Sequence, residues 1–259
     1  MYAYKKAMAL KVDVLEMDVY LTNDDHLVLM HDNNVKKTTD FKGSRSDYRV
    51  HNFTLEELKE LNAGHKWAPA GSKERPYEND PDKDLKVTTL QEVFDQFPGM
   101  RMNIEMKKAA PGQSPARKLS EMICRNNMSD KVLVASFSDD YIREFRRLCP
   151  EVATSASGEE LVKFEIGSLI RRRRQPNADA LQVIDKFWPV WVVTDRLVGL
   201  AHCRGLRPEA AARCRKFPVH AWTVNDLEGM RRMIALGVDG IITDYPGPLL
   251  ALLNRPWTG

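Results

Sequence analysis

Five side chains able to do chemistry lie near the ends of short apolar segments: Glu16, Asp18, His31, Glu105 and Lys107. Side chains alternate across a β-strand, so Glu16 shares a face with Asp18, and Glu105 shares one with Lys107. Three carboxylates without thiolates suit a hard cation, and the pattern does not choose between Mg²⁺ and Ca²⁺. A histidine can move a proton and a lysine can hold an anion. This combination favours a metal-assisted phosphoryl site.

Each of these residues also has a purely structural interpretation. An acid near a strand end is often solvated or salt-bridged, and Glu105 and Lys107 could simply pair. A single histidine such as His31 is more often structural than catalytic. It is the joint arrangement on one predicted face that favours the metal site, because unpaired acids are costly on a barrel strand.

The elements that must position these residues alternate along the chain. Short apolar segments, punctuated by turn residues, predict strands at 12–21, 26–31, 100–107, 131–136, 151–156, 178–184, 218–224 and 239–243. Helical segments between them predict parallel pairing by right-handed crossovers. About eight such units favour an α/β TIM (β/α)8 barrel, whose active site lies at the carboxyl ends of the strands. An open doubly wound sheet is the alternative, but no GxGxxG or GxxxxGK[ST] loop supports it.

Helix starts carry recognisable capping residues. Capping boxes are predicted at Thr54 with Glu57, at Thr89 with Glu92, and an N-cap at Ser114 before Pro115; Asn225 with Glu228 is predicted to open the helix DLEGMRRMIAL. These residues satisfy backbone N–H groups that a helix leaves unpaired in its first turn.

Composition narrows the function classes. The chain has 259 residues, and 39 Lys and Arg against 36 Asp and Glu give a net charge of +3, too balanced to favour nucleic-acid binding. Apolar runs are too short for a predicted transmembrane segment. The four cysteines form no CxxC pair, so zinc binding and thiol redox chemistry are poorly supported and buried free thiols are expected: Cys124, Cys149, Cys203 and Cys214.

Five blocks of sequence resemble one known family. They are VLEMDVYLTNDDHLVLMHDNNVKKTTD, KVTTLQEVFDQFP, NIEMK, HAWTVND and GVDGIITDYP, and the similarity runs from Met1 to about Pro246. Together they resemble the glycerophosphodiester phosphodiesterase family. The resemblance implies a TIM barrel that hydrolyses glycerophosphodiesters to sn-glycerol 3-phosphate and an alcohol, in lipid and glycerol metabolism.

The same resemblance assigns roles to residues of this chain. It implies that Glu16, Asp18 and Glu105 bind the divalent metal, Mg²⁺ or Ca²⁺. It places the second catalytic histidine on His31 and the phosphate-contacting lysine on Lys107, which is expected to serve both catalysis and substrate binding. Trp222, in the W-T-V-N segment, is expected to line the substrate pocket, with plain core packing as the alternative.

One departure from the family pattern concerns the start of the chain. The family opens with an H-R-G strand, whereas Met1–Lys11 resembles the helix that follows it. The expectation is therefore a single domain over 1–259 that lacks its first strand and one histidine of the acid–base pair, with weakened turnover. An insertion over 44–87, rich in Pro, Gly and charge at 62–86, is expected to cap the substrate.

Other readings stay open. A lysophospholipase D-type activity on lysophospholipids, or a non-catalytic relative, would fit the same residues. The Arg171–Arg174 run reads as a solvated helix end, with acidic-lipid or nucleic-acid binding as the alternative. The predicted partner is a small-molecule substrate, without nucleic acid, and the predicted location is cytoplasmic. The sequence predicts no oligomeric state.

Overall fold

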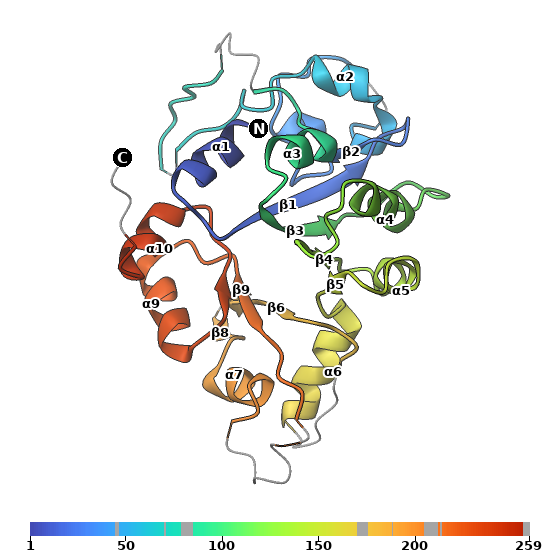
Figure 1. Cartoon of the computed structure of the whole chain (residues 1–259). Coiled ribbons are helices and arrows are strands. Elements are labelled where there is room, and N and C mark those ends of the chain that lie inside the picture. Colours follow the sequence, from blue (N-terminus) through green and yellow to red (C-terminus); the bar gives the residue numbers. More distant parts are fainter. Residues whose placement is uncertain are drawn as a thin grey trace. The chain divides into compact units, whose positions relative to one another are not determined.

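The computed structural model describes residues 1–44, 47–69, 71–78, 85–169, 176–187, 189–204, 212 and 214–255 (Figure 1). They form two compact units, Met1–Val152 and Ala153–Gly259. Each unit has a hydrophobic core of its own. The predicted arginine run at Arg171–Arg174 lies outside the described residues.

The first unit is built on a sheet with the strand order β2-β1-β3-β4. The strands are β1 (Val14–Leu21), β2 (Leu27–Leu29), β3 (Arg101–Met106) and β4 (Val132–Ala135). β1, β3 and β4 pair in parallel, as predicted. The helices of this unit are α1 (Tyr2–Ala9), α2 (Leu55–Lys59), α3 (Leu90–Gln96), α4 (Pro115–Arg125) and α5 (Asp139–Leu148).

The strand β2 corrects the sequence prediction, because it pairs antiparallel to β1, with Val19 opposite Leu29. A parallel return needs a crossover of a dozen or more residues, and only a tight turn separates these two strands. In that turn the Thr22 N–H donates to the His26 carbonyl at 3.0 Å, and Asp25 adopts a left-handed φ of 59°. The carboxyl end of β2 therefore does not coincide with that of β1.

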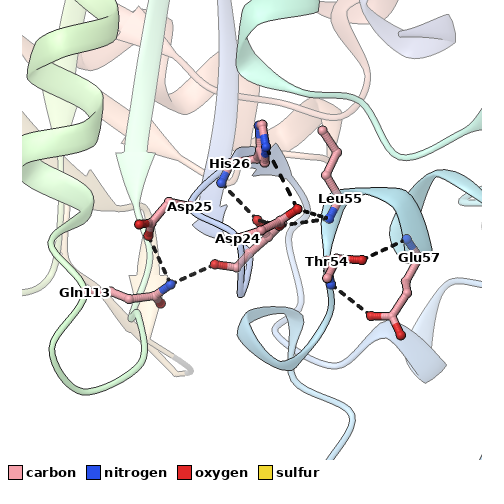
Figure 2. Close-up of polar contacts among 8 residues, drawn as sticks. Asp24, Asp25, His26, Thr54, Leu55, Glu57 and Gln113 are labelled. Carbon is pink, nitrogen blue, oxygen red and sulfur yellow. Dashed lines mark hydrogen bonds and ion pairs between the residues drawn. The ribbon is translucent and has the colours of Figure 1, made fainter.

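Polar side chains hold this turn against two neighbouring segments (Figure 2). The Asp24 carboxylate accepts hydrogen bonds from the Thr22 hydroxyl at 2.6 Å and from the Leu55 N–H at 3.0 Å. The Gln113 amide donates to the Thr22 carbonyl at 2.7 Å and to Asp25 at 3.4 Å. The turn is thus tied both to the start of α2 and to the loop before α4.

The expected insertion over 44–87 is ordered in its described residues. It contains the short helices η2 (Val50–Asn52) and α2, and an antiparallel bridge joins Asn62 to Lys86. A separate hydrophobic cluster joins it to the β1–β2 hairpin: Tyr20, Val28, Val35, Val50, Phe53, Leu58, Leu61 and Val87. This segment therefore packs as a small substructure on the first unit, and its role as a substrate cap stays a prediction.

Three of the four predicted helix starts are confirmed. Thr54 and Thr89 form complete capping boxes with Glu57 and Glu92, and the Ser114 hydroxyl accepts from the Arg117 N–H. The fourth prediction was wrong by one residue, since Asp226 rather than Asn225 caps α9 (Leu227–Leu236), accepting from the Gly229 N–H. The Asn225 side chain is engaged elsewhere, with Thr243 and Asp244.

The second unit repeats the strand–helix pattern. Its strands β6 (Leu181–Ile184), β9 (Val219–Trp222) and β10 (Gly240–Ile241) pair in parallel in the order β6-β9-β10. A parallel bridge from Ser155 to Ala180 joins the segment after β5 (Ala153–Thr154) to the residue before β6. The helices are α6 (Gly158–Leu169), α7 (Asp195–Ala201), α9 and α10 (Pro246–Leu252). Every predicted strand segment therefore contains a strand.

Two features of the second unit were not predicted. A hairpin of β7 (Lys186–Phe187) and β8 (Val190–Trp191) follows β6, too short to give an alternating pattern. The expectation of four free thiols was wrong, because Cys203 and Cys214 form a disulfide with their Cα atoms 6.1 Å apart. Cys124 and Cys149 are free thiols as expected, although Cys124 is exposed. Across the described residues, we find no helix with the length and apolar character needed to cross a membrane.

Candidate active site

The strand β1 presents two chemically different faces, as its alternation predicts. Leu15, Met17 and Val19 are at most 2% exposed and belong to the core of the first unit. Glu16 and Asp18 lie on the opposite face and are partly exposed. Burying the apolar face fixes the register of the strand, so the two acids must point to the other side.

The neighbouring strand β3 brings its own polar side chains beside these acids. In the parallel register Asp18 lies opposite Glu105, and Glu16 lies opposite Asn103. The Lys107 N–H donates to the Val19 carbonyl at 3.0 Å, which continues the pairing just past β3. Two strands therefore place a row of polar side chains on one face of the sheet.

Lys107 joins the two acids of this row. Its ammonium lies 3.0 Å from the Asp18 carboxylate and 2.8 Å from the Glu105 carboxylate. The three side chains are only 11–19% exposed. We call Glu16, Asp18, Asn103, Glu105 and Lys107 the acidic cluster. At its centre, the carboxylates of Asp18 and Glu105 share the single ammonium group of Lys107.

The electrostatics of the acidic cluster reflect this arrangement. Burial raises the pKa of Glu105; the Lys107 ammonium opposes that rise, and the charge of Asp18 adds to it. Burial alone would lower the pKa of Lys107, but its contacts with Glu105 and Asp18 outweigh burial and raise it. The surroundings of Glu105 therefore still disfavour its ionised form, despite the adjacent Lys107 ammonium.

The acidic cluster offers the oxygen donors that a hard divalent cation prefers, although Glu16, Asp18 and Glu105 are not, among the described residues, a set whose ligand atoms all lie within 4.8 Å of one another. In addition to the three carboxylates, the Asn103 side chain is 6% exposed, and its buried Oδ1 has no hydrogen-bond partner among the residues that the structure describes. A buried carbonyl oxygen without a partner is costly, and an oxygen-seeking cation would satisfy it. Asn103 was not among the predicted site residues; its i, i+2 relation to Glu105, which puts both on one face of β3, is the signal that could have found it.

The structure places the His31 side chain beside Asp32, at the turn that follows β2. In the described part of the chain, its imidazole approaches the Asp32 carboxylate at 3.8 Å, and its side chain is 83% exposed. The same carboxylate lies 2.9 Å from the Lys37 ammonium. The Tyr20 hydroxyl donates to the His31 carbonyl at 3.5 Å, which links this turn to β1. The His31 imidazole is therefore exposed to solvent and lies next to one carboxylate.

Two tyrosines near the acids were missed from the sequence. Burial raises the pKa of Tyr4 in α1 well above its ordinary value, and the charges of Glu16 and Asp18 raise it further. Burial also raises the pKa of Tyr20, with Lys107 opposing the rise and Asp18 adding to it. Both hydroxyls thus stay protonated near the acids. No sequence signal connects Tyr4 to strand β1, because only packing of the helix brings it there.

Trp222 belongs to the second unit. It ends β9 opposite Ile184, and its carbonyl accepts a hydrogen bond from the Asp185 N–H at 2.9 Å. Three residues later, the Asn225 amide donates to Asp244 at 2.7 Å, and its carbonyl accepts from the Asp244 N–H at 2.9 Å. These bonds hold together the segments that follow β9 and β10.

Solved structures establish the type of fold. The glycerophosphoryl diester phosphodiesterase domain of an uncharacterized protein from Mycobacterium tuberculosis matches with a TM-score of 0.74 at 18% identity, covering 98% of this chain and 92% of that one. An Oleispira antarctica phosphodiesterase, in complex with the product sn-glycerol-3-phosphate, matches with a TM-score of 0.68 at 21% identity, covering 96% and 88%. The fold is therefore the TIM-barrel type of these phosphodiesterases, as predicted.

Sequence comparison establishes the family. The pattern of the glycerophosphoryl diester phosphodiesterase family matches residues 1–248. A glycerophosphodiester phosphodiesterase of Caldanaerobacter subterraneus is 31% identical, across 98% of this chain and 90% of that protein. The chain belongs to the glycerophosphoryl diester phosphodiesterase family and is a phosphoric diester hydrolase.

Proposed function

We propose that this protein hydrolyses glycerophosphodiesters to sn-glycerol 3-phosphate and an alcohol, using a divalent cation held by Glu16, Asp18 and Glu105. The carrying observation is the acidic cluster, in which Lys107 lies 3.0 Å from Asp18 and 2.8 Å from Glu105 on the sheet face predicted for the site. The family relationship supports the substrate class, since a relative of the same fold was solved with sn-glycerol-3-phosphate as its product.

Residues of this chain would divide the work as follows. Mg²⁺ or Ca²⁺, when bound to the three carboxylates, would offset negative charge that develops on the phosphate oxygens. Lys107 would hold an anionic phosphate oxygen of the substrate, since its ammonium already lies on this face between two acids. Its role is then to bind and orient the phosphodiester beside the carboxylates.

His31 is the proposed proton donor. In hydrolysis a water oxygen bonds to phosphorus and the P–O bond to the alcohol breaks, so the leaving alkoxide needs a proton. The exposed imidazole of His31, beside the Asp32 carboxylate at 3.8 Å, can supply it. Trp222 lies in a segment that resembles the W-T-V-N segment of the family. We therefore include Trp222 among the proposed substrate-binding residues.

Purified protein incubated with glycerophosphocholine and Mg²⁺ or Ca²⁺ tests the proposal. We expect release of sn-glycerol 3-phosphate that a chelator stops, and we expect Glu105→Gln to reduce kcat by about 10²- to 10³-fold. Asp130→Asn is the matched control, because that carboxylate is 79% exposed and pairs with the adjacent Lys131. No release above the uncatalysed rate would refute the proposed function.

A parallel assay with lysophosphatidylcholine separates the alternative activity. Release of lysophosphatidic acid at a higher kcat/KM than release of sn-glycerol 3-phosphate would identify a lysophospholipase D-type enzyme. A role in lipid and glycerol metabolism is a prediction that depends on the substrate found in these assays. The cytoplasmic location also stays a prediction.

A further inference from the structure

A second group of potential ligands lies on the first unit, away from the acidic cluster. Cys124 is in the last turn of α4, Cys149 follows α5, and Glu151 comes two residues later. In the part of the chain that the structure describes, these three are the one set of three or more His, Cys, Asp or Glu whose ligand atoms all lie within 4.8 Å of one another. We call them the thiol cluster.

The distances in the thiol cluster suit a tetrahedral metal site. The two Sγ atoms are 3.4 Å apart, and Cys124 Sγ lies 3.9 Å from Glu151 Oε1. With metal–sulfur bonds of about 2.3 Å and metal–oxygen bonds of about 2.1 Å, a tetrahedral zinc ion separates two sulfurs by roughly 3.7 Å and a sulfur from an oxygen by roughly 3.6 Å. These two separations therefore lie within a few tenths of an ångström of the tetrahedral values, and the Cys149 sulfur lies within 4.8 Å of a Glu151 carboxylate oxygen.

Burial gives the thiol cluster a fixed side and an open side. Cys149 is 2% exposed, and its Sγ lies 3.8 Å from the Ser120 carbonyl of α4. Its backbone N–H donates to the Phe145 carbonyl at 2.8 Å, which anchors it to the end of α5. Cys124 and Glu151 are exposed, so an ion can enter from solvent between them. Cys149 is thus a ligand held in place by burial, and Cys124 and Glu151 lie on the path by which an ion would enter. The fourth position of a tetrahedral site is left for water.

We propose that Cys124, Cys149 and Glu151 bind a thiophilic divalent cation of the Zn²⁺ type, which links the end of α4 to the segment after α5. Two thiolates select such an ion over Mg²⁺ or Ca²⁺, which take oxygen ligands. Binding releases the thiol protons to solvent, one from each cysteine that is protonated beforehand. No change in sulfur oxidation state is involved.

Cadmium titration of the full chain tests this site, because sulfur bound to Cd²⁺ gives a characteristic ultraviolet absorption band that carboxylates do not give. In protein kept reduced, we expect one equivalent of Cd²⁺ to saturate the band and Zn²⁺ to displace it. Cys124→Ser should abolish the band. Loss of a residue that only supports a metal ligand weakens binding by roughly tenfold or more. Because Glu151 is proposed to be a ligand itself, Glu151→Gln should weaken Cd²⁺ binding by more than about tenfold.

The other two cysteines provide the control. Reductant would also free Cys203 and Cys214 from their disulfide, so a Cys203→Ser/Cys214→Ser variant must keep the band with unchanged stoichiometry. Loss of the band in this control, or its survival in Cys124→Ser, overturns the proposal. The proposal is also overturned if reduced wild-type protein gives no absorption band with Cd²⁺. This includes the case in which Cys124 and Cys149 form a disulfide on air oxidation instead of binding a metal. If Cys124→Ser fails to fold, Glu151→Gln decides the question, since its side chain is exposed.

Discussion

The acidic cluster and the thiol cluster belong to the same compact unit and are assembled in different ways. The acidic cluster comes from two adjacent parallel strands, where alternation places Glu16 with Asp18 and Asn103 with Glu105 on one face. The thiol cluster comes from two helix ends, with Cys124 and Cys149 separated by 25 residues. Strand periodicity shows the first in the sequence, whereas only helix packing creates the second.

The two clusters also differ in charge. The acidic cluster contains carboxylates that already hold the Lys107 ammonium, so its ligands need no deprotonation before a cation binds. The thiol cluster contains two thiols with sulfurs in contact at 3.4 Å and one carboxylate. A metal cation must displace protons from the thiol cluster, whereas it must displace the Lys107 ammonium from the acidic cluster. This difference can be measured.

The largest expected difference is the pH dependence of metal affinity. Burial raises the pKa of the Cys149 thiol to about 12, so this group must lose a proton when the cation binds. Between about pH 6.5 and 8, Cd²⁺ affinity should rise by up to about a hundredfold per pH unit when two protons are released. Mg²⁺ or Ca²⁺ affinity should change far less, because carboxylates are ionised throughout this range. Calorimetric titrations at several pH values measure both, and equal slopes would break the distinction between the clusters.

A large effect on stability is expected at Lys107. Lys107→Met leaves Asp18 and Glu105 as adjacent, mostly buried carboxylates, which should cost about 3 kcal/mol of unfolding free energy without metal. For a chain of this size that corresponds to roughly 6–12 °C in Tm. Saturating Ca²⁺ or Mg²⁺ should restore part of the loss, because it supplies the missing positive charge.

Lys59→Met is the matched control for Lys107. The Lys59 ammonium lies 2.6 Å from Glu92, a side chain that is 48% exposed. An exposed ion pair contributes about 0–1 kcal/mol, so this variant should lower Tm little and should not respond to metal. Equal losses in the two variants would show that the acidic cluster has no special demand for a cation.

A smaller effect is expected at Asn103. Asn103→Leu removes the unpartnered Oδ1, so the metal-free protein should keep its stability or gain some, since a buried unsatisfied amide is unfavourable. Affinity for Mg²⁺ or Ca²⁺ should fall by about 10- to 100-fold, as for groups that support a metal site. Cd²⁺ binding at the thiol cluster should not change. Full retention of Mg²⁺ and Ca²⁺ affinity would exclude Asn103 from the acidic cluster's metal site.

The smallest effect is expected at the turn between β1 and β2. Burial alone would raise the pKa of Asp24, but its bonds from Thr22 and Leu55 outweigh burial and lower it. Its contribution to stability is therefore present above the ordinary carboxyl pKa and is lost as pH falls through the lowered value. Because this side chain is 41% exposed, Asp24→Asn should cost less than about 1 kcal/mol at pH 7.

Urea unfolding at neutral and acid pH measures the Asp24 effect. The cost of Asp24→Asn should vanish at low pH, where the wild-type carboxylate is also protonated. Neither cluster should lose metal affinity in this variant. A loss of Mg²⁺ or Ca²⁺ affinity would show that the turn and the acidic cluster are coupled.

Predictions succeeded where local patterns control structure. The apolar alternation of β1 and β3 fixed which side chains share a face, and the capping residues Thr54, Thr89 and Ser114 fixed helix starts. Asn225 failed as the cap because Asp226, one residue later, takes that position, while the Asn225 side chain bonds to Asp244 instead. Strand β2 was assigned correctly, but its direction depends on the length of the turn before it.

By itself, the sequence determined most of the strand positions, the face that carries Glu16, Asp18, Glu105 and Lys107, and the family, because these follow from periodicity and motifs along the chain. Only the tertiary structure decided which partners these residues meet. It set Lys107 between two carboxylates, left Asn103 Oδ1 without a partner, and brought Cys124 to Cys149. The physical reason is that distances between residues far apart in sequence are fixed by packing, which local patterns do not encode.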